Sequence, residues 1–163
     1  MTLGVQLVHF EAARQQLALA HSVDEVKVIR DKHAAVQAYL KQQGASKDMQ
    51  NQCAEIRLRA ERRLGELLAE ADRVQGERVD MTSAHREPKS FKATVERVGI
   101  SLPMAKRWQL EATIPEEVFE RHVAETKAKS EELTTASVLQ LASRMQRQET
   151  IKDLSRTSKT LEA

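Results

Sequence analysis

The chain of 163 residues contains one cysteine, Cys53, and few aromatic residues, only 3% of the total. A single cysteine excludes a disulfide within the chain and is typical of proteins in a reducing compartment. The scarcity of aromatic side chains, beside 40% hydrophobic and 31% charged residues, predicts exposed helices with thin cores of leucine, valine and alanine. No run approaches the roughly eighteen apolar residues of a membrane span, and the N-terminus has no apolar signal-peptide core. We therefore expect a cytoplasmic protein that is not associated with a membrane.

Sequence signals of catalysis and metal binding are also missing. The five histidines are scattered, and none stands at metal-ligand spacing with Cys53. The chain has no nucleophile elbow, no phosphate-binding P-loop and no glycine-rich dinucleotide turn. Because His33 and Cys53 fall on apolar helix faces, we interpret both as packed side chains. The sequence thus predicts no enzyme, and no site for a metal, a cofactor or a small-molecule substrate.

Residues 1–75 are predicted to be helical throughout, because apolar residues recur at every third or fourth position. A first helix is followed by a second, which begins with a capping box at Ser22 and continues until Gly44. A third and longer helix begins at Ser46 or Lys47. The first two helices should pair as an antiparallel hairpin, which the third would overhang.

An apolar seam along this third helix is the predicted contact between two copies of the chain. Its residues are Ile56, Ala60, Leu64, Leu67 and Ala71. Two apolar positions in seven are typical of coiled-coil packing, either within one chain or between two. The overhanging part of the helix needs a partner, and a second copy would supply one, so we expect a homodimer or a higher homo-oligomer. The alternative is a closed three-helix bundle within one chain. Gly65 is a mild interruption, costing about 1 kcal/mol relative to alanine.

A linker predicted at residues 76–88 separates this half from a pair of short helices. The linker combines glycine, proline, serine and threonine with mixed charges and no sustained period. Ser90 is a candidate N-cap for the first helix of the pair, and Gly99 should end that helix in a left-handed turn. Ser101 can cap the second helix, with Pro103 in its first turn. The pattern predicts two helices joined by a tight turn.

The second helix of the pair is predicted to have an apolar face and a basic face. Ala105, Trp108 and Ala112 recur at i, i+3 and i+7, which places them on the inner side. Lys106 and Arg107 fall on the outer side. A short helix, a glycine turn and a second helix with a basic outer face form a helix-turn-helix. The alternative for the basic pair is an ordinary solvated surface, and we interpret Trp108 as a core residue rather than a stacking platform.

After these two helices come a helix start, IPEEV, and a helix that begins LTTASVLQLA. In this order of parts, residues 90–142 resemble the central DNA-binding domain of ParB-type partition proteins and their plasmid-regulator relatives. The resemblance implies that Ser101–Thr113 lies in the major groove of double-stranded DNA. We find no nucleotide-binding arginine motif of that family upstream, and Arg62 and Arg63 fall in a strongly helical run instead. The resemblance therefore does not extend to the N-terminal nucleotide-binding domain of that family.

The predicted DNA contacts follow from the resemblance and from the usual docking of a helix-turn-helix. Ser101, Leu102 and Pro103 form the turn that enters the groove, and Lys106 and Arg107 face bases and phosphates. The set is completed at the start of the first helix by Ser90 and by two predicted phosphate anchors, Lys89 and Lys92. For Ser101 the simpler alternative is a helix cap and nothing more.

The predicted fold class is all-α. The expected parts are a helical coiled-coil stem at 1–75, the linker at 76–88, a helix-turn-helix domain at 89–147 and a polar tail at 148–163. The predicted function is sequence-specific DNA binding as a dimer, by a transcriptional regulator or DNA-organising factor of a phage or mobile element. The alternative belongs to another class: a helical adaptor that binds a protein, such as an antitoxin-like or anti-defence scaffold. The basic helix face distinguishes the two, because an adaptor does not need it.

Overall fold

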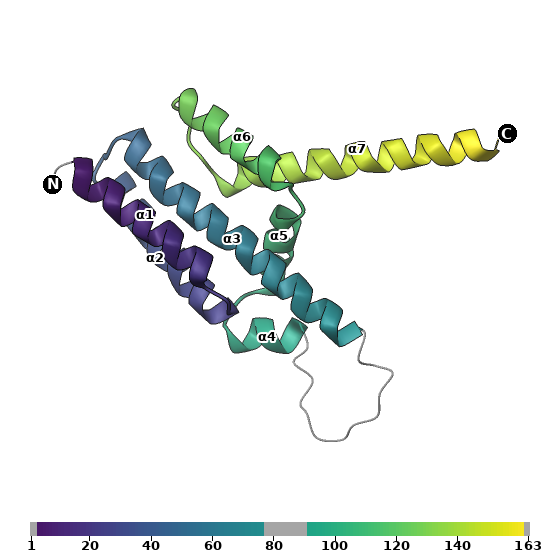
Figure 1. Ribbon diagram of the computed structural model, residues 1–163, viewed down its shortest axis with the longest axis horizontal. Helices are drawn as coiled ribbons and strands as arrows, with labels where there is room; N and C mark the ends of the chain where they lie inside the picture. Colours follow the sequence, from purple (N-terminus) through teal and green to yellow (C-terminus); the bar gives the residue numbers. More distant parts are fainter. Residues whose placement is uncertain (1–2, 77–90, 162–163) are drawn as a thin grey trace, which may run out of the picture.

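The computed structural model describes residues 3–76 and 91–161, which form seven α-helices and no β-strand (Figure 1). In chain order the helices are α1 (Leu3–Leu19), α2 (Val23–Gln42), α3 (Lys47–Gly76), α4 (Phe91–Arg97), α5 (Leu102–Ala112), α6 (Glu116–Ala128) and α7 (Thr135–Leu161). The predicted all-α fold class is therefore confirmed. Among the described residues, no helix combines the length and the apolar character needed to cross a membrane.

The start and end of α2 and the start of α3 lie at the signals that the sequence predicts. At the start of α2, the Ser22 hydroxyl accepts a hydrogen bond from the Glu25 N–H, and the Glu25 carboxylate accepts one from the Ser22 N–H, both at 3.2 Å. Gly44 follows α2 with a φ of +66°. The Ser46 hydroxyl accepts from the Met49 N–H at 3.4 Å and caps α3. The three helices then lie side by side, with α2 antiparallel to both neighbours (Figure 1).

The long helix α3 contributes to two hydrophobic cores, and each core combines residues from both halves of the chain. The first contains Leu17, Ala20, Val26, Ala60, Leu64, Leu68, Val95, Val98, Ile100, Ala105 and Trp108. The second contains Ala54 and Leu58 of α3 with Ile114, Phe119, Val123, Leu133, Val138, Leu141 and Ala142. The predicted division into a stem at 1–75 and a domain at 89–147 therefore does not separate two cores. The linker predicted at 76–88 falls outside the described residues, apart from the last residue of α3.

The seam predicted to join two copies is covered within the chain. Ile56 is 1% exposed, and Ala60 and Leu64 are fully buried, whereas Leu67 and Ala71 are half-buried. Ala60 and Leu64 pack in the first core with residues of α2, α4 and α5. The assignment of Ile56, Ala60 and Leu64 to a contact between copies is therefore corrected. Periodicity identifies a buried helix face, but it does not identify what covers that face.

The last helix is longer than the sequence predicts. α7 extends through most of the stretch predicted as a polar tail, 148–163, and ends at Leu161. Its first part packs in the second core, and the remainder projects away from the other helices (Figure 1). On the projecting part, Ile151 and Leu154 are 65% and 66% exposed.

Candidate nucleic-acid interface

The turn between α4 and α5 has the geometry that its sequence predicts. Gly99 has a φ of +67°, in the left-handed region that disfavours a Cβ. The N–H of Ile100 donates to the Val95 carbonyl at 2.9 Å and closes the end of α4. Ser101 then caps α5, because its hydroxyl accepts from the Met104 N–H at 3.4 Å. The two helices are thus joined by a short turn whose backbone is fixed by hydrogen bonds at both ends.

Helix α5 has one buried face and one exposed face. Ala105 is fully buried and Trp108 is 2% exposed, both in the first core, which confirms the core role predicted for Trp108. The guanidinium of Arg30 lies over the Trp108 ring, 5.4 Å from its centroid. Lys106 and Arg107 are exposed on the opposite face. Neither forms an ion pair with any residue that the structure describes, so this basic surface is open.

Helix α5 lies very close to α3 where it passes Gly65. A Cβ on Gly65 would overlap with the backbone carbonyl of Trp108 and would lie 2.9 Å from the backbone nitrogen of Gln109. The sequence predicts only a mild interruption of the helix at this glycine. The structure gives the residue a second role, because the missing side chain lets two helix backbones touch. The direction in which α5 presents its basic pair is therefore fixed by packing against α3.

The other predicted DNA contacts within the described residues lie at the first turns of α4 and α5. Ser101 and Pro103 are exposed, and Leu102 is 39% exposed. On α4, the Lys92 side chain is 69% exposed, and its Nζ lies 3.8 Å from the Glu96 carboxylate. So loose a surface pair contributes little to stability and leaves the lysine available.

The remaining two candidates, Lys89 and Ser90, fall outside the described residues. At the other end of α4, Arg97 forms an ion pair with Asp24 of α2 at 2.9 Å, and both side chains are more than half exposed. Of the basic residues on α4 and α5, Arg97 is thus the one engaged with another helix. No local pattern in the sequence predicts this pair, because its members are far apart in the chain.

Buried and half-buried polar side chains lie next to the inner face of α5, and most of them belong to α2, α3 and α7. The Glu61 carboxylate, 1% exposed, accepts hydrogen bonds from Arg30 at 3.0 Å and from Arg57 and the Thr135 hydroxyl at 3.1 Å. Glu111 of α5 is fully buried, and neither of its carboxyl oxygens has a hydrogen-bond partner among the described residues. Burial, followed by the nearby charge of Glu61, raises the pKa of Glu111 to about 8. The Glu111 carboxyl is therefore mainly protonated at neutral pH.

Glu111 takes the place on the inner face of α5 that the sequence assigns to Ala112. Ala112 is only half-buried, while Glu111 continues the buried row that begins with Ala105 and Trp108. Sequence reasoning missed this residue because a glutamate is almost never expected in a core. The one available signal was its position three residues after Trp108, on the same side of the helix.

Two side chains that often carry chemistry are packed elsewhere. Cys53 is 1% exposed, and burial raises the pKa of its thiol to about 11. His33 is 8% exposed, its Nδ1 lies 2.8 Å from the Ile29 carbonyl oxygen, and burial lowers its pKa. The interpretation of both as packed side chains is confirmed.

The surface of α5 thus combines a basic pair, an exposed first turn and a buried opposite face. Such a surface suits a negatively charged partner, because Lys106 and Arg107 would not have to break an ion pair with a described residue in order to bind it. No protein-family model, curated protein or solved structure matches this chain.

Proposed function

We propose that this chain is a sequence-specific DNA-binding protein that inserts α5 into the major groove as the second helix of a helix-turn-helix. The observation that carries the proposal is the pair Lys106 and Arg107. Both are exposed, neither is ion-paired within the described residues, and the helix that bears them is packed against α3. By contrast, Arg57, Arg59 and Arg62 of α3 are all bound to carboxylates. A helix fits the major groove, and its first turns reach the base edges.

Each part of α4 and α5 has a role in this proposal. Lys106 and Arg107 contact bases and phosphates, and a good bidentate contact to one base contributes about 1–3 kcal/mol of discrimination. The exposed first turn, with Leu102, meets base edges and adds the positive end of the helix macrodipole. Lys92 on α4 contacts the phosphate backbone, which fixes the position of the protein on the duplex.

The biological role that we propose is that of a transcriptional regulator or DNA-organising factor of a phage or mobile element. Its support is the resemblance of residues 90–142 to ParB-type central domains. One such helix gives modest affinity, so we propose that two copies bind together and gain affinity through effective concentration. Because Ile56, Ala60 and Leu64 are buried within the chain, the copies meet through a surface that does not include these three residues.

Selection of bound sequences from a random pool of duplex DNA tests the proposal. We expect the full chain to enrich a discrete motif, with two related half-sites if two copies bind. The variant Lys106→Ala/Arg107→Ala, with unchanged helicity, should enrich no motif. Failure of the wild-type chain to enrich any sequence, or equal enrichment by the variant, would contradict DNA reading by α5.

A protein-binding adaptor is the second candidate, and the projecting part of α7 favours it. Ile151 and Leu154 are exposed there, on the part of α7 that projects away from the other described helices, and exposed apolar residues on a helix suit a protein partner. Retention on random-sequence DNA at low salt discriminates between the two functions. Equal retention of the wild-type chain and the Lys106→Ala/Arg107→Ala variant would favour the adaptor, because an adaptor makes no use of this basic pair.

A further inference from the structure

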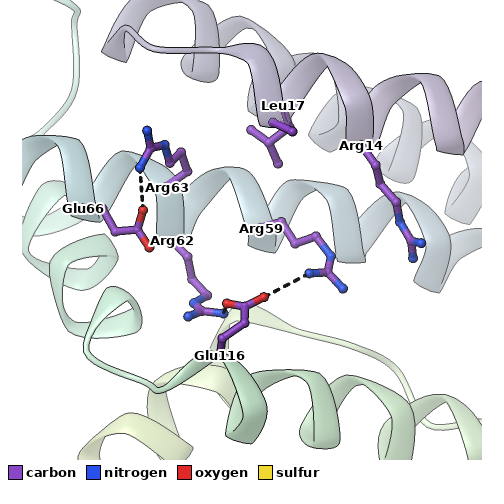
Figure 2. A pocket seen from close by; sticks show the side chains of 8 residues that line it. Arg14, Leu17, Arg59, Arg62, Arg63, Glu66 and Glu116 are labelled. Carbon is purple, nitrogen blue, oxygen red and sulfur yellow. Dashed lines mark hydrogen bonds and ion pairs between the residues drawn. The ribbon is translucent and has the colours of Figure 1, made fainter.

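A cavity of about 400 Å³ lies between α1, α3 and the first turn of α6. Its lining includes Arg14 and Leu17 from α1, Arg59, Arg62 and Arg63 from α3, and Glu116 from α6 (Figure 2). Four arginines therefore surround one cavity, against two lining glutamates, of which Glu66 is the second. Arginine is the side chain best suited to phosphate, because its planar donors match two phosphate oxygens at once.

Arg62 is held as a buried donor at this cavity. Its side chain is 7% exposed, and its guanidinium lies 4.2 Å from the centroid of the Phe119 ring. One terminal nitrogen donates to the Ile114 carbonyl and the other to the Glu116 carboxylate, both at 2.8 Å. The buried Nε has no hydrogen-bond partner among the described residues. An unpaired buried donor on a cation is unfavourable, so the present partners of Arg62 do not satisfy all of its donors.

The carboxylate of Glu116 already occupies the position of an anion. It bridges two arginines, with one oxygen 2.8 Å from Arg62 and the other 3.5 Å from Arg59 (Figure 2). The Glu116 side chain is nevertheless 64% exposed, so it can leave the arginines and enter solvent without unfolding the chain. It stands in the first turn of α6, whose N-cap, Pro115, forms no side-chain capping bond. The positive end of the α6 macrodipole therefore points at the same place.

The ion pairs around the cavity leave an excess of positive charge. Arg14, Arg59 and Lys127 share the Glu55 carboxylate, and Arg59 also binds Glu120. With Arg62 and Glu116 included, the connected cluster has four cations and three carboxylates. Movement of Glu116 into solvent would leave four cations facing two carboxylates. A doubly charged anion would neutralise this excess of positive charge.

We propose that this cavity binds a phosphate group between Arg59, Arg62 and the first turn of α6, with Glu116 as an internal carboxylate that the ligand displaces. The phosphate is either free in solution or part of a DNA backbone that reaches this side of the protein. The first source is independent of the proposed function. The second rests on it.

The test compares Glu116→Gln with Glu117→Gln in the full chain. The two substitutions make the same chemical change at neighbouring exposed positions, but Glu117 has no ion pair with a described residue. Titration with inorganic phosphate at constant ionic strength is the first measurement, and duplex DNA affinity is the second. We expect Glu116→Gln to bind phosphate about tenfold more tightly than Glu117→Gln, because one competing charge-assisted contact is removed. Arg62→Lys, which keeps the charge and loses the planar fork, should bind about tenfold more weakly than wild type.

Each outcome decides the proposal. Tighter phosphate binding by Glu116→Gln alone supports a site for free phosphate, even if the wild-type chain binds no DNA. Absence of phosphate binding, together with DNA affinity that rises only in Glu116→Gln, supports a site for a backbone phosphate. If Glu116→Gln and Glu117→Gln behave alike in both measurements, the proposal is overturned, and DNA reading by α5 is unaffected.

Discussion

The backbone carbonyl of Trp108 in α5 occupies the space that a side chain on Gly65 of α3 would fill. This contact joins the helix at the centre of the fold to the helix that bears the basic pair. Because it is made by backbone atoms, it cannot be relieved by rotating a side chain. The position of α5 on the body of the protein therefore depends on a glycine at residue 65.

Replacement of this glycine by alanine should destabilise the protein. Helix propensity alone favours alanine by about 1 kcal/mol, but the added Cβ must push two backbones apart. Overpacking of this kind usually costs about 1–3 kcal/mol, and we expect the loss to exceed the propensity gain for Gly65→Ala. The measurement is the free energy of unfolding in urea, with Glu70→Ala, at an exposed position of the same helix, as the control. A Gly65→Ala protein more stable than wild type would show that the helices have room to separate.

The stability of the protein should fall as pH rises through the titration of Glu111. Burial raises the pKa of this carboxyl from 4.5 to about 8, so the folded chain keeps a proton that the unfolded chain releases. The free energy of unfolding should therefore decrease between about pH 4.5 and about pH 8, and this group should remove no further stability above that range. Glu111→Gln, which cannot ionise, should lose this decrease.

The difference in stability between Glu111→Gln and wild type, measured by urea unfolding at several pH values, checks the prediction. Burial lowers the pKa of His33 and of His122, which acts in the opposite direction at lower pH, but both histidines are common to the two proteins and cancel. The free energy of unfolding of Glu111→Gln, relative to that of wild type, should increase as pH rises. A difference that does not change with pH would mean that Glu111 is ionised or solvated in the folded protein.

Asn51 should be essential to the connection between α6 and α7. Its side-chain amide donates to the Glu131 carbonyl at 2.7 Å, and its side-chain oxygen accepts from the Leu133 N–H at 2.9 Å. Asn51 is 2% exposed and Leu133 is fully buried, so Asn51→Ala removes a hydrogen bond from two backbone groups, one of which, the Leu133 N–H, is buried. We expect a loss of about 2–4 kcal/mol in the free energy of unfolding. Gln52→Ala, which removes only a surface hydrogen bond to Asp48, is the control, and equal losses in the two variants would contradict the role of Asn51.

The helix ends and turns could be predicted from the sequence because their signals are local. Ser22 and Glu25 satisfy each other within one turn of helix. Gly99 needs a left-handed backbone, and Ser101 caps the helix that starts directly after it. The inner position of Trp108 followed equally from its spacing within α5.

The partners of the buried faces could not be predicted, because they depend on contacts far apart in the chain. The seam through Ala60 and Leu64 was correctly recognised as apolar, but α2, α4 and α5 cover it rather than a second copy. The spacing of the arginines along α3 likewise gave no indication of the cavity that they line. Arg59 and Arg62 are neighbours on α3, three residues apart, but the carboxylate that bridges them belongs to Glu116 of α6, far along the chain.

We propose that α5 reads DNA through Lys106 and Arg107. The most direct test is the affinity for a selected duplex as a function of salt concentration, for wild type, Lys106→Ala/Arg107→Ala and the control Arg121→Ala/Lys129→Ala. The control removes two exposed basic residues of the α6 region that form no ion pair with described residues. The two double variants therefore have the same net charge.

We expect the loss of Lys106 and Arg107 to reduce affinity by about a hundredfold or more at moderate salt. We also expect the slope of log affinity against log salt to become shallower by about 0.9 for each lost phosphate contact. The control should keep the affinity of wild type to within a few fold. Wild-type affinity and slope in Lys106→Ala/Arg107→Ala, or an equal loss in the control, would contradict DNA reading by α5.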